Sequence, residues 1–527
     1  MPTNPITSPQ QSPGTRASEV HLFIFSVVDG EPRVALFRRS ENARTLKNCL
    51  APICGAIEPN EPPTAAAWRA LKQHAGLTSH AVEFSRKGKP FISEDNNAEL
   101  IICPFAFRLR APGEGSLSEN AIALDDEHTE WSWHNPDIVV HNEADLSIIP
   151  NTSQSLRRVW FEADMNKAAG EALRSGLEQL KTDHKSGANE LASIALKSFR
   201  DVLMHLHNDP NWWETARKAA WHLWKNGRES MGAATLNVLL HTLAELRKTI
   251  GNNLEEERNW DRSLAAVDYQ LEERRKIDLR IKESFTLYLQ ANFLPPAKAR
   301  SCDTLSILTL SASSTIRDSI LDAFAALPIP RLDLRILESR PLFEGASMGS
   351  SILTEFQQKF PPSSDRSLNM TIYTDASAAL ASADVDFALL GADRISHLGD
   401  VSNKTGSLPA VLSAKHVHPK VKVLVLSGLD KIAEPGTEHE VENNDRTEII
   451  SSWLANGGKG VKVIESGLSA TQSRTNCIVE VKNIYFEWVP RGLIDEYICE
   501  EGIWNESRIY HRAVEIEYMI HDYFGSI

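Results

Sequence analysis

Two groups of residues lying close together in the sequence are suited to chemistry: a carboxylate, and a lysine beside a glycine turn. The run DFALLGA (386–392) is almost entirely apolar and predicts a buried parallel strand, so Asp393 follows its carboxyl end, where open α/β sheets bind ligands. Ten residues later, Asn403 and Lys404 lead through a turn containing Gly406 into the helical pattern LPAVLSAKH. Helix N-terminal amides beside an ammonium group form an anion site. The segment therefore predicts acid/base chemistry next to a bound phosphate.

These side chains need a rigid sheet edge, and the surrounding pattern predicts one. Helical or loop stretches long enough for crossovers separate a series of short apolar runs, which favours a parallel, doubly wound sheet. We therefore predict a Rossmann-like domain over residues 299–527. The candidate strands are 305–310, 333–338, 370–374, 386–391, 422–428 and 477–482.

Two further domains are predicted before it. Residues 151–298 carry apolar side chains at a helical period, with Leu191, Phe199 and Leu206 among those on one face, and predict an all-helical domain. Residues 19–150 form an α+β domain. Its expected strands are 20–28, 33–39 and 99–110, and its expected helix is 64–77. Residues 1–18, rich in Pro, Ser and Thr, predict a disordered tail. The predicted fold class is multidomain α/β.

Composition excludes several classes of protein. The 527 residues allow about three or four domains. The net charge of -14 argues against broad nucleic-acid binding. No apolar run reaches the roughly 18 residues of a membrane helix. Six cysteines without CxxC spacing favour free thiols in a reducing compartment, so we expect a cytoplasmic protein without membrane contact.

The segment GAIEPNEPPTAAAWRALKQHAGL (55–77) resembles the Nudix box. The family holds a divalent cation on acidic side chains of the box core, but Ala70, Gln73 and His74 stand at those positions here. Since hard ions such as Mg²⁺ prefer carboxylate oxygens, we expect no metal and no hydrolysis. The matching positions are Gly55, Glu61, Arg69, Leu71, Gly76 and Leu77.

Two interpretations of this degenerate domain stay open. The old pocket could still hold a nucleotide without cutting it, with Trp68, Trp131 or Trp133 as stacking faces. Alternatively, these tryptophans are core or interface residues, as large aromatic side chains usually are.

A second resemblance covers roughly residues 155–527. GADRI, GDV and NKTGS are similar to the signature of a family that joins three subunits of eukaryotic translation initiation factor 2B (alpha, beta and delta) with methylthioribose-1-phosphate isomerase and ribose-1,5-bisphosphate isomerase. Further elements follow the family order: NGRESMGAATLNVLL (226–240), ESRPLFEG (338–345), VENND (441–445) and NIYFEWVPRGLIDEYICEEG (483–502). The resemblance implies a helical domain packed on a Rossmann-like domain, a sugar-phosphate pocket between the two, and a homodimer formed through the latter.

The resemblance also implies roles for individual residues. Asp393 would be the general acid/base, and Asn403, Lys404, Gly406 and Arg340 would bind phosphate. Arg228 would match a further phosphate-binding arginine, although Glu229 stands where the family has proline.

The family's catalytic cysteine follows the first strand of the Rossmann-like domain, and Ser311 stands in its place. A thiol has a pKa of about 8.5 and a hydroxyl a far higher one, so Ser311 cannot replace a thiolate base unless it is activated.

Two functions therefore stay open. In the first, the protein binds a sugar phosphate or nucleotide and acts by association, with translation factor subunits as possible partners. In the second, it is an aldose–ketose isomerase that acts on a phosphorylated ribose, with Asp393 as acid/base and Ser311 as a hydrogen-bonding group. The missing thiol favours the first, and the retained Asp393 favours the second. Neither requires a cofactor.

Overall fold

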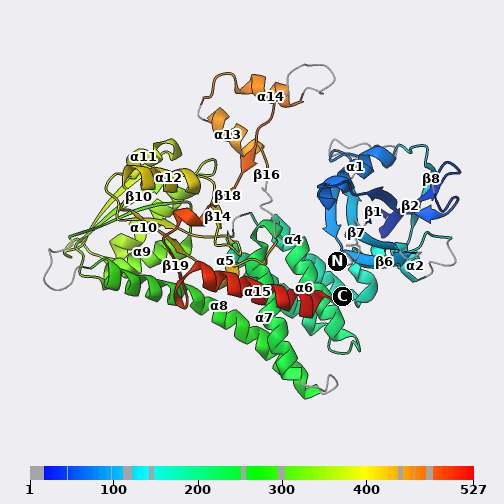
Figure 1. Cartoon of the computed structure of the whole chain (residues 1–527), viewed down its shortest axis with the longest axis horizontal. Helices are drawn as coiled ribbons and strands as arrows, with labels where there is room; N and C mark the ends of the chain where they lie inside the picture. Colours follow the sequence, from blue (N-terminus) through cyan, green and yellow to red (C-terminus); the bar gives the residue numbers. More distant parts are fainter. Residues whose placement is uncertain are drawn as a thin grey trace, which may run out of the picture. The chain divides into compact units, whose positions relative to one another are not determined.

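The computed structural model forms two compact units (Figure 1). The first unit comprises residues 1–174, 208–218 and 527, and the second comprises 175–207 and 219–526. The domain boundaries expected at residues 150 and 298 stay a prediction, and most of the expected tail lies outside the described residues. The structure describes residues 17–43, 45–95, 98–110, 122–141, 147–184, 186–250, 257–294, 303–436, 443–455, 457–469 and 479–527.

The first unit is built on an eight-stranded mixed sheet whose central strands are apolar. β1 pairs with β2 and β4 in antiparallel fashion and with β7 in parallel. The predicted strands and helix are confirmed. The elements are β1 (Ala17–Val28), β2 (Glu31–Arg39), β3 (Leu50–Ala51), β4 (Ile53–Ala56), α1 (Pro63–Ala75), β5 (Val82–Lys87), β6 (Phe91–Asp95), β7 (Ala98–Leu109), β8 (His128–His134), α2 (Pro136–His141), α3 (Thr152–Arg157) and the 3₁₀ turn η2 (Phe161–Asp164).

Helix α1 packs its small side chains against this sheet. Ala66, Ala70 and Leu71 are at most 1% exposed and belong to the core cluster formed with strands β1, β2 and β7. The helix ends at Gly76, whose φ of 65° is the left-handed conformation that glycine adopts most easily. The alanine-rich sequence thus lets the helix approach the sheet closely.

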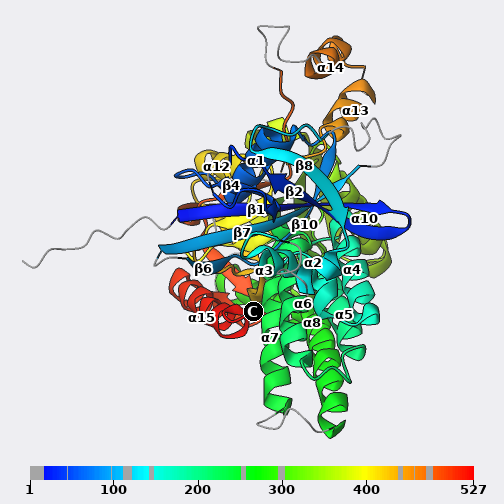
Figure 2. The same cartoon turned by 90° about the vertical axis from the view of Figure 1, so that its right-hand side faces the viewer.

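The helices of residues 167–292 bury the face that the sequence predicts. In α5, Leu191, Phe199 and Val202 are at most 1% exposed. Figures 1 and 2 show α7 and α8 side by side. The bounds are α4 (Lys167–Thr182), α5 (Ala188–Met204), α6 (Trp212–Asn226), η3 (Glu229–Met231), α7 (Gly232–Ile250) and α8 (Glu257–Asn292).

The second unit contains a seven-stranded sheet in the order β11-β10-β9-β12-β15-β19-β20. All neighbours are parallel except β19 and β20. Numbered along the chain, the parallel strands run 3-2-1-4-5-6, the Rossmann order. The doubly wound prediction is confirmed. The strands are β9 (Thr304–Leu310), β10 (Arg331–Leu337), β11 (Ser367–Tyr373), β12 (Phe387–Leu390), β15 (Lys422–Leu426), β19 (Glu496–Cys499) and β20 (Gly502–Trp504).

Helices and short elements complete this unit. The second half of α8 shares one core with the sheet, through Phe285 and Leu289 against Leu305 and Phe387. No described helix is long and apolar enough to cross a bilayer. The remaining elements are α9 (Ser314–Ala326), α10 (Glu344–Lys359), η4 (Asp375–Ser377), α11 (Ala378–Ala381), β13 (Arg394–Ile395), β14 (Val401–Lys404), α12 (Ser407–Val417), η5 (Leu429–Lys431), β16 (Asn443–Asn444), α13 (Thr447–Ala455), α14 (Val461–Ser469), β17 (Asn483–Ile484), β18 (Phe486–Val489), η6 (Arg491–Leu493) and α15 (Glu506–Phe524).

One predicted strand is wrong. Of the run 477–482, residues 479–482 are described and are not in a strand, and 477–478 lie outside the described residues. The sixth parallel strand is instead β19, where Tyr497, Ile498 and Cys499 are at most 7% exposed. The alternating apolar and charged side chains of 477–482 do not suit a strand buried on both faces, whereas the apolar run in β19 does.

Gly345 allows α10 to begin against the end of β10, and we expect Gly345→Ala to destabilise the protein by at least about 3 kcal/mol. An added β-carbon would lie 1.8 Å from the carbonyl oxygen of Leu337, so the backbone would have to move. Gly492→Ala is the control, because nothing lies within 4 Å of its added β-carbon. Urea unfolding of both variants measures the difference, and equal midpoints would refute the close approach.

Candidate functional site

The predicted catalytic residues flank the point where the strand order reverses. Ser311 follows β9 and Asp393 lies just beyond β12, and these two strands are parallel neighbours. The Thr309 hydroxyl donates to the Leu389 carbonyl oxygen at 3.0 Å, which ties the two strand ends together. Ligands of doubly wound sheets bind outside the carboxyl ends at such a switch point. The fold therefore places Ser311 and Asp393 where the sequence predicts a site.

Asp393 and Asn403 lie on neighbouring segments of this edge. The Asp393 amide donates to the Ser402 carbonyl oxygen at 2.9 Å, and the Asp393 residue is partly exposed. Asn403 Nδ2 donates to Ser407 Oγ at 2.9 Å. A β-carbon added at Gly391 would lie 3.6 Å from Asn403 Oδ1. The strand end before Asp393 therefore packs directly on Asn403.

A hydrogen-bonded turn connects Ser311 to the end of β10. Ser311 has a φ of 65°, and its amide donates to Ser339 Oγ at 2.8 Å. The amides of Ser339 and Arg340 in turn donate to the two carboxylate oxygens of Asp375 at 2.9 and 2.8 Å. These bonds fix the backbone at the ends of β9 and β10.

The Arg340 guanidinium is near this edge but already has a carboxylate partner. Its Nε donates to Glu338 Oε1 at 2.8 Å, and its side chain is 49% exposed. The guanidinium also lies 5.2 Å from the ring centre of Phe343. A phosphate that engaged Arg340 would compete with Glu338.

Lys404 is buried in an ion pair. It is only 8% exposed, and its Nζ lies 2.5 Å from Glu344 Oε1, at the first residue of α10. Its ammonium also lies 4.5 Å from the ring centre of Tyr485. Among the described residues, Glu344 Oε2 is buried without a hydrogen-bond partner. The Lys404 side chain is therefore buried, and the Glu344 carboxylate balances the charge of its ammonium group.

The N-terminus of α12 also meets an internal carboxylate. The amides of Gly406 and Leu408 donate to Glu487 Oε1 at 2.6 and 3.0 Å. Gly406 has a φ of 109°, and an added β-carbon there would lie 3.4 Å from Leu310 Cδ1. Glu487 therefore holds the amides at which the sequence predicts a phosphate.

Arg228 approaches the same group of residues from the helical part of this unit. It donates through Nη1 to the Asp183 carbonyl oxygen at 3.0 Å. Burial raises the pKa of Tyr485 and so does its hydrogen bond to Glu448, whereas the charge of Arg228 opposes this rise. Arg228 and Lys404 thus both influence Tyr485 electrostatically, and the phosphate site that they would share stays a prediction.

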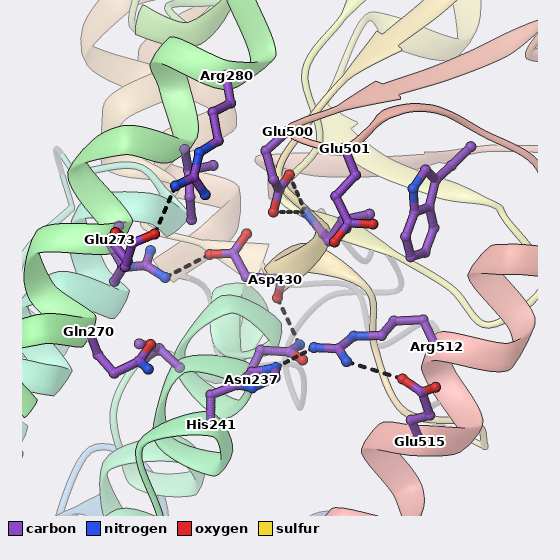
Figure 3. A pocket seen from close by; sticks show the side chains of 15 residues that line it. Asn237, His241, Gln270, Glu273, Arg280, Asp430, Glu500, Glu501, Arg512 and Glu515 are labelled. Atoms are coloured by element: carbon purple, nitrogen blue, oxygen red, sulfur yellow. Dashed lines mark hydrogen bonds and ion pairs between the residues drawn. The ribbon is translucent and has the colours of Figure 1, made fainter. Parts of the chain in front are cut away.

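A cavity of about 470 Å³ lies further along this edge, outside the carboxyl ends of β15 and β19 (Figure 3). It is lined by α7, α8, η5, β20 and α15 and the turn after β19, and by none of the seven predicted site residues. Its lining residues are Asn237, Val238, His241, Gln270, Glu273, Arg274, Ile277, Arg280, Leu429, Asp430, Glu500, Glu501, Trp504, Arg512 and Glu515.

The cavity is lined by charged side chains, and some of its buried polar atoms have no hydrogen-bond partner among the described residues. Arg274 pairs with Asp430 at 2.8 Å. Burial, and then the charge of Asp430, raises the pKa of Glu500 to about 7. Among the described residues, Asn237 Oδ1, Trp504 Nε1 and Arg512 Nε are buried without hydrogen-bond partners. A polar molecule in the cavity could supply both donors and acceptors to these atoms.

The residues of this cavity escaped the sequence analysis, and so did Glu344, Glu487 and Tyr485. Glu344, Tyr485, Glu487 and Glu500 do lie inside the quoted family-like motifs, so their motif membership is a signal that could have found them. Asn237 and Val238 of α7 also lie inside a quoted motif, whereas the α8 residues had no such signal, because charged residues on a helix are usually solvated.

Two polar residues that match the Nudix box, Glu61 and Arg69, bind each other. Arg69 forms two hydrogen bonds to the Glu61 carboxylate, at 2.8 and 2.7 Å, and this contact lowers the pKa of Glu61 to about 2. Ala70 is 1% exposed, and a β-carbon added at Gly55 would lie 2.7 Å from Ala70 Cβ. The tryptophans pack against the core: Trp68 stacks edge-on to Phe107, with ring centres 4.9 Å apart.

Comparison with known proteins agrees with both parts of the chain. Residues 236–506 match the model of the initiation factor 2 subunit family. The chain belongs to this family. Residues 18–152 match the model of the NUDIX domain, so this family member carries an N-terminal Nudix domain.

Several curated relatives of this family member are methylthioribose-1-phosphate isomerases. The protein from Xylella fastidiosa (strain M23) is 27% identical over 208 residues, which are 38% of this chain and 49% of that protein. The protein from Vitis vinifera is 31% identical over 169 residues, 32% of this chain and 39% of that protein. The chain thus spans about half or less of the length of these relatives.

Two of the solved structures that are similar to this family member cover different shares of the chain. Translation initiation factor eIF-2B from Pyrococcus horikoshii OT3 covers 63% of this chain and 96% of that chain, at 19% identity and a TM-score of 0.44. An Ap4A hydrolase complex from C. elegans covers 27% of this chain and 94% of that chain, at 17% identity and a TM-score of 0.22. The family assignment rests on the sequence models.

Removing one partner of the buried pair should cost far more stability than removing both. Lys404→Met leaves the Glu344 carboxylate without its cation, and we expect a loss of about 3 kcal/mol. The double variant Lys404→Met/Glu344→Met should recover most of it, because no charge stays unpaired. Lys422→Met is the control: Lys422 is 56% exposed beside Asp495, so its loss should cost less than about 1 kcal/mol. Urea unfolding measures the free energy of unfolding of each variant. If the double variant lost as much stability as Lys404→Met and Glu344→Met together, the two side chains would not be coupled.

The raised pKa of Glu500 should appear in the pH dependence of stability. The folded protein holds this proton up to about pH 7, whereas the unfolded chain releases it near the ordinary glutamate pKa of 4.5. Stability should therefore fall as pH rises from about 4.5 to 7. Glu500→Gln should remove this fall and gain about 3 kcal/mol at pH 8, with little effect at pH 4. Glu501→Gln is the control: the Glu501 side chain is 57% exposed, and this variant should lose stability with rising pH as the parent protein does. Urea unfolding across this range measures it.

Proposed function

We propose that this family member binds a sugar phosphate or nucleotide at the carboxyl edge of the Rossmann-like sheet and acts by association rather than by turnover. The observation that carries this proposal is the buried pair of Lys404 and Glu344, at 2.5 Å. A ligand phosphate that binds Lys404 would compete with Glu344 for its ammonium group. Binding is then coupled to the start of α10, and a ligand that favours one arrangement shifts the population toward it.

The chemistry of the switch point supports binding without turnover. Ser311 offers a hydroxyl in the place of a thiol, and a hydroxyl is a poor base unless a neighbour activates it. Among the described residues, Ser311 forms one hydrogen bond, from its amide to Ser339 Oγ, and its hydroxyl forms none. We extend the same proposal to the Nudix domain, where Glu61 is held by Arg69 and Ala70 is in the core, so hydrolysis is not expected.

The alternative function is an aldose–ketose isomerase acting on methylthioribose 1-phosphate or ribose 1,5-bisphosphate. Two observations favour it: Asp393 is retained beyond β12 at the switch point, and the relatives above carry an isomerase name. In this reaction Asp393 would move a proton between adjacent carbons. A homodimer formed through the Rossmann-like part and association with translation factor subunits remain further proposals.

Calorimetry and NMR on the same samples separate the two functions. We expect the full chain to bind methylthioribose 1-phosphate, ribose 1,5-bisphosphate or adenosine monophosphate without forming ketose. Glu344→Gln should tighten binding several-fold, because it removes the internal competitor. The double variant Lys404→Met/Glu344→Met should weaken binding at least about tenfold, the size of one charged hydrogen bond. Lys422→Met should bind like the parent protein.

Each other outcome has a definite meaning. Ketose formation that Asp393→Asn abolishes would establish the isomerase and refute the binding role. Ser311→Cys tests the missing thiol directly: new turnover in this variant would show that the parent site binds the substrate and lacks only the base. Failure of all three compounds to bind the folded protein would refute ligand binding at this edge.

A further inference from the structure

A cluster of two histidines and one aspartate lies in the Nudix domain, and one of the histidines, His74, stands at an acidic position of the Nudix-like box. His74 is in the last turn of α1, His128 is the first residue of β8, and Asp125 lies three residues before it. The Ala123 amide donates to the Ala75 carbonyl oxygen at 3.0 Å, which brings the segment before β8 against the end of α1. The backbone of two separate elements therefore holds the three side chains together.

The three side chains point their polar atoms at one another. His74 Nδ1 lies 2.5 Å from Asp125 Oδ2, and His128 Nδ1 lies 2.7 Å from Asp125 Oδ1. One ligand atom from each residue lies within 4.8 Å of the other two. The side chains of His74, Asp125 and His128 are only 12%, 22% and 6% exposed. This is a shielded cluster rather than a set of solvated surface groups.

The surroundings favour a charged carboxylate facing the imidazoles. The Asp125 carboxylate faces both imidazoles, with a different oxygen toward each Nδ1. The Glu127 amide also donates to Asp125 Oδ1 at 3.2 Å. The rings of Phe37 and His128 meet edge to face, with centres 5.8 Å apart, so an aromatic side chain forms one wall. A negative oxygen donor is thus held between two nitrogen donors.

We infer that His74, Asp125 and His128 form a site for a divalent first-row transition metal, with Zn²⁺ the best match. Such an ion takes the place of the two protons that now join the imidazoles to the carboxylate. Two imidazole nitrogens and one carboxylate oxygen are a ligand set that Zn²⁺ uses, with a fourth position left for water or a substrate atom. This inference departs from the sequence-based expectation of no metal, which rested on the carboxylates missing from the Nudix box and did not consider a nitrogen-rich set.

The alternative is that the cluster only fastens α1 to the segment before β8 through hydrogen bonds. The two interpretations differ in what chelation and mutation do. A metal site makes the protein more stable with Zn²⁺ than after chelation, because an ion that binds only the folded state stabilises it. If the cluster only forms hydrogen bonds, the stability of the protein should be the same with Zn²⁺ and after chelation.

The full chain is stripped with a chelator, dialysed against Zn²⁺ or Mg²⁺, and its metal content and thermal midpoint are measured. We expect one Zn²⁺ per chain above background, a raised midpoint with Zn²⁺, and neither effect with Mg²⁺. Co²⁺ in place of Zn²⁺ should give the visible absorption of a four-coordinate site.

Variants then assign the ion to the cluster. His74→Ala/His128→Ala should lose the bound Zn²⁺ and the Co²⁺ absorption, whereas His80→Ala, at an exposed histidine of the same domain, should keep both. Asp125→Asn, which retains an oxygen acceptor, should weaken Zn²⁺ binding while circular dichroism shows a folded chain. Zn²⁺ retained by the double variant, or no Zn²⁺ above background in the parent protein, would overturn the inference.

Discussion

The buried ion pair between Lys404 and Glu344 is the constraint on which the candidate ligand site depends. It joins β14 to the first turn of α10, and α10 follows the turn that leaves β10. A charge 8% exposed needs a partner, because an unpaired buried charge costs several kcal/mol. The pair therefore holds the start of α10 against β14 as long as no other anion binds Lys404. Ligand binding at Lys404 is thus linked to the position of α10.

The parallel sheet concentrates polar groups at one edge. The carboxyl ends of β9, β10 and β12 carry Ser311, Arg340 and Asp393, while the carboxyl ends of β15 and β19 lead to Asp430 and Glu500 in the cavity. All parallel strands end at the same edge, so residues far apart in the sequence come to lie along it. The same geometry gives this edge two chemical environments, one centred on a lysine and one rich in carboxylates.

The sequence predicted the parts of the site that depend on local pattern. The apolar run before Asp393 and the glycine turn at Gly406 each fix a strand end or a helix start through nearby residues alone. The partners of these groups depend on long-range packing: Glu344 is 60 residues from Lys404, and Glu487 is 81 residues from Gly406. The error at 477–482 has the same origin, because only burial on both faces distinguishes β19 from an alternating apolar segment.

The two internal carboxylates are not equivalent as competitors for a phosphate. Glu487 lies on β18, where it pairs with Asn403 of β14, and one of its oxygens accepts two amide hydrogen bonds. Moving it would break strand pairing as well as those bonds. Glu344 has one oxygen on Lys404, and its other oxygen has no partner among the described residues. Because Glu344 is the first residue of a helix rather than part of a paired strand, its side chain can move away from Lys404 at a smaller cost in hydrogen bonds. A ligand phosphate is therefore expected to exchange with Glu344 at Lys404, while Glu487 stays at the α12 terminus as a fixed part of the fold.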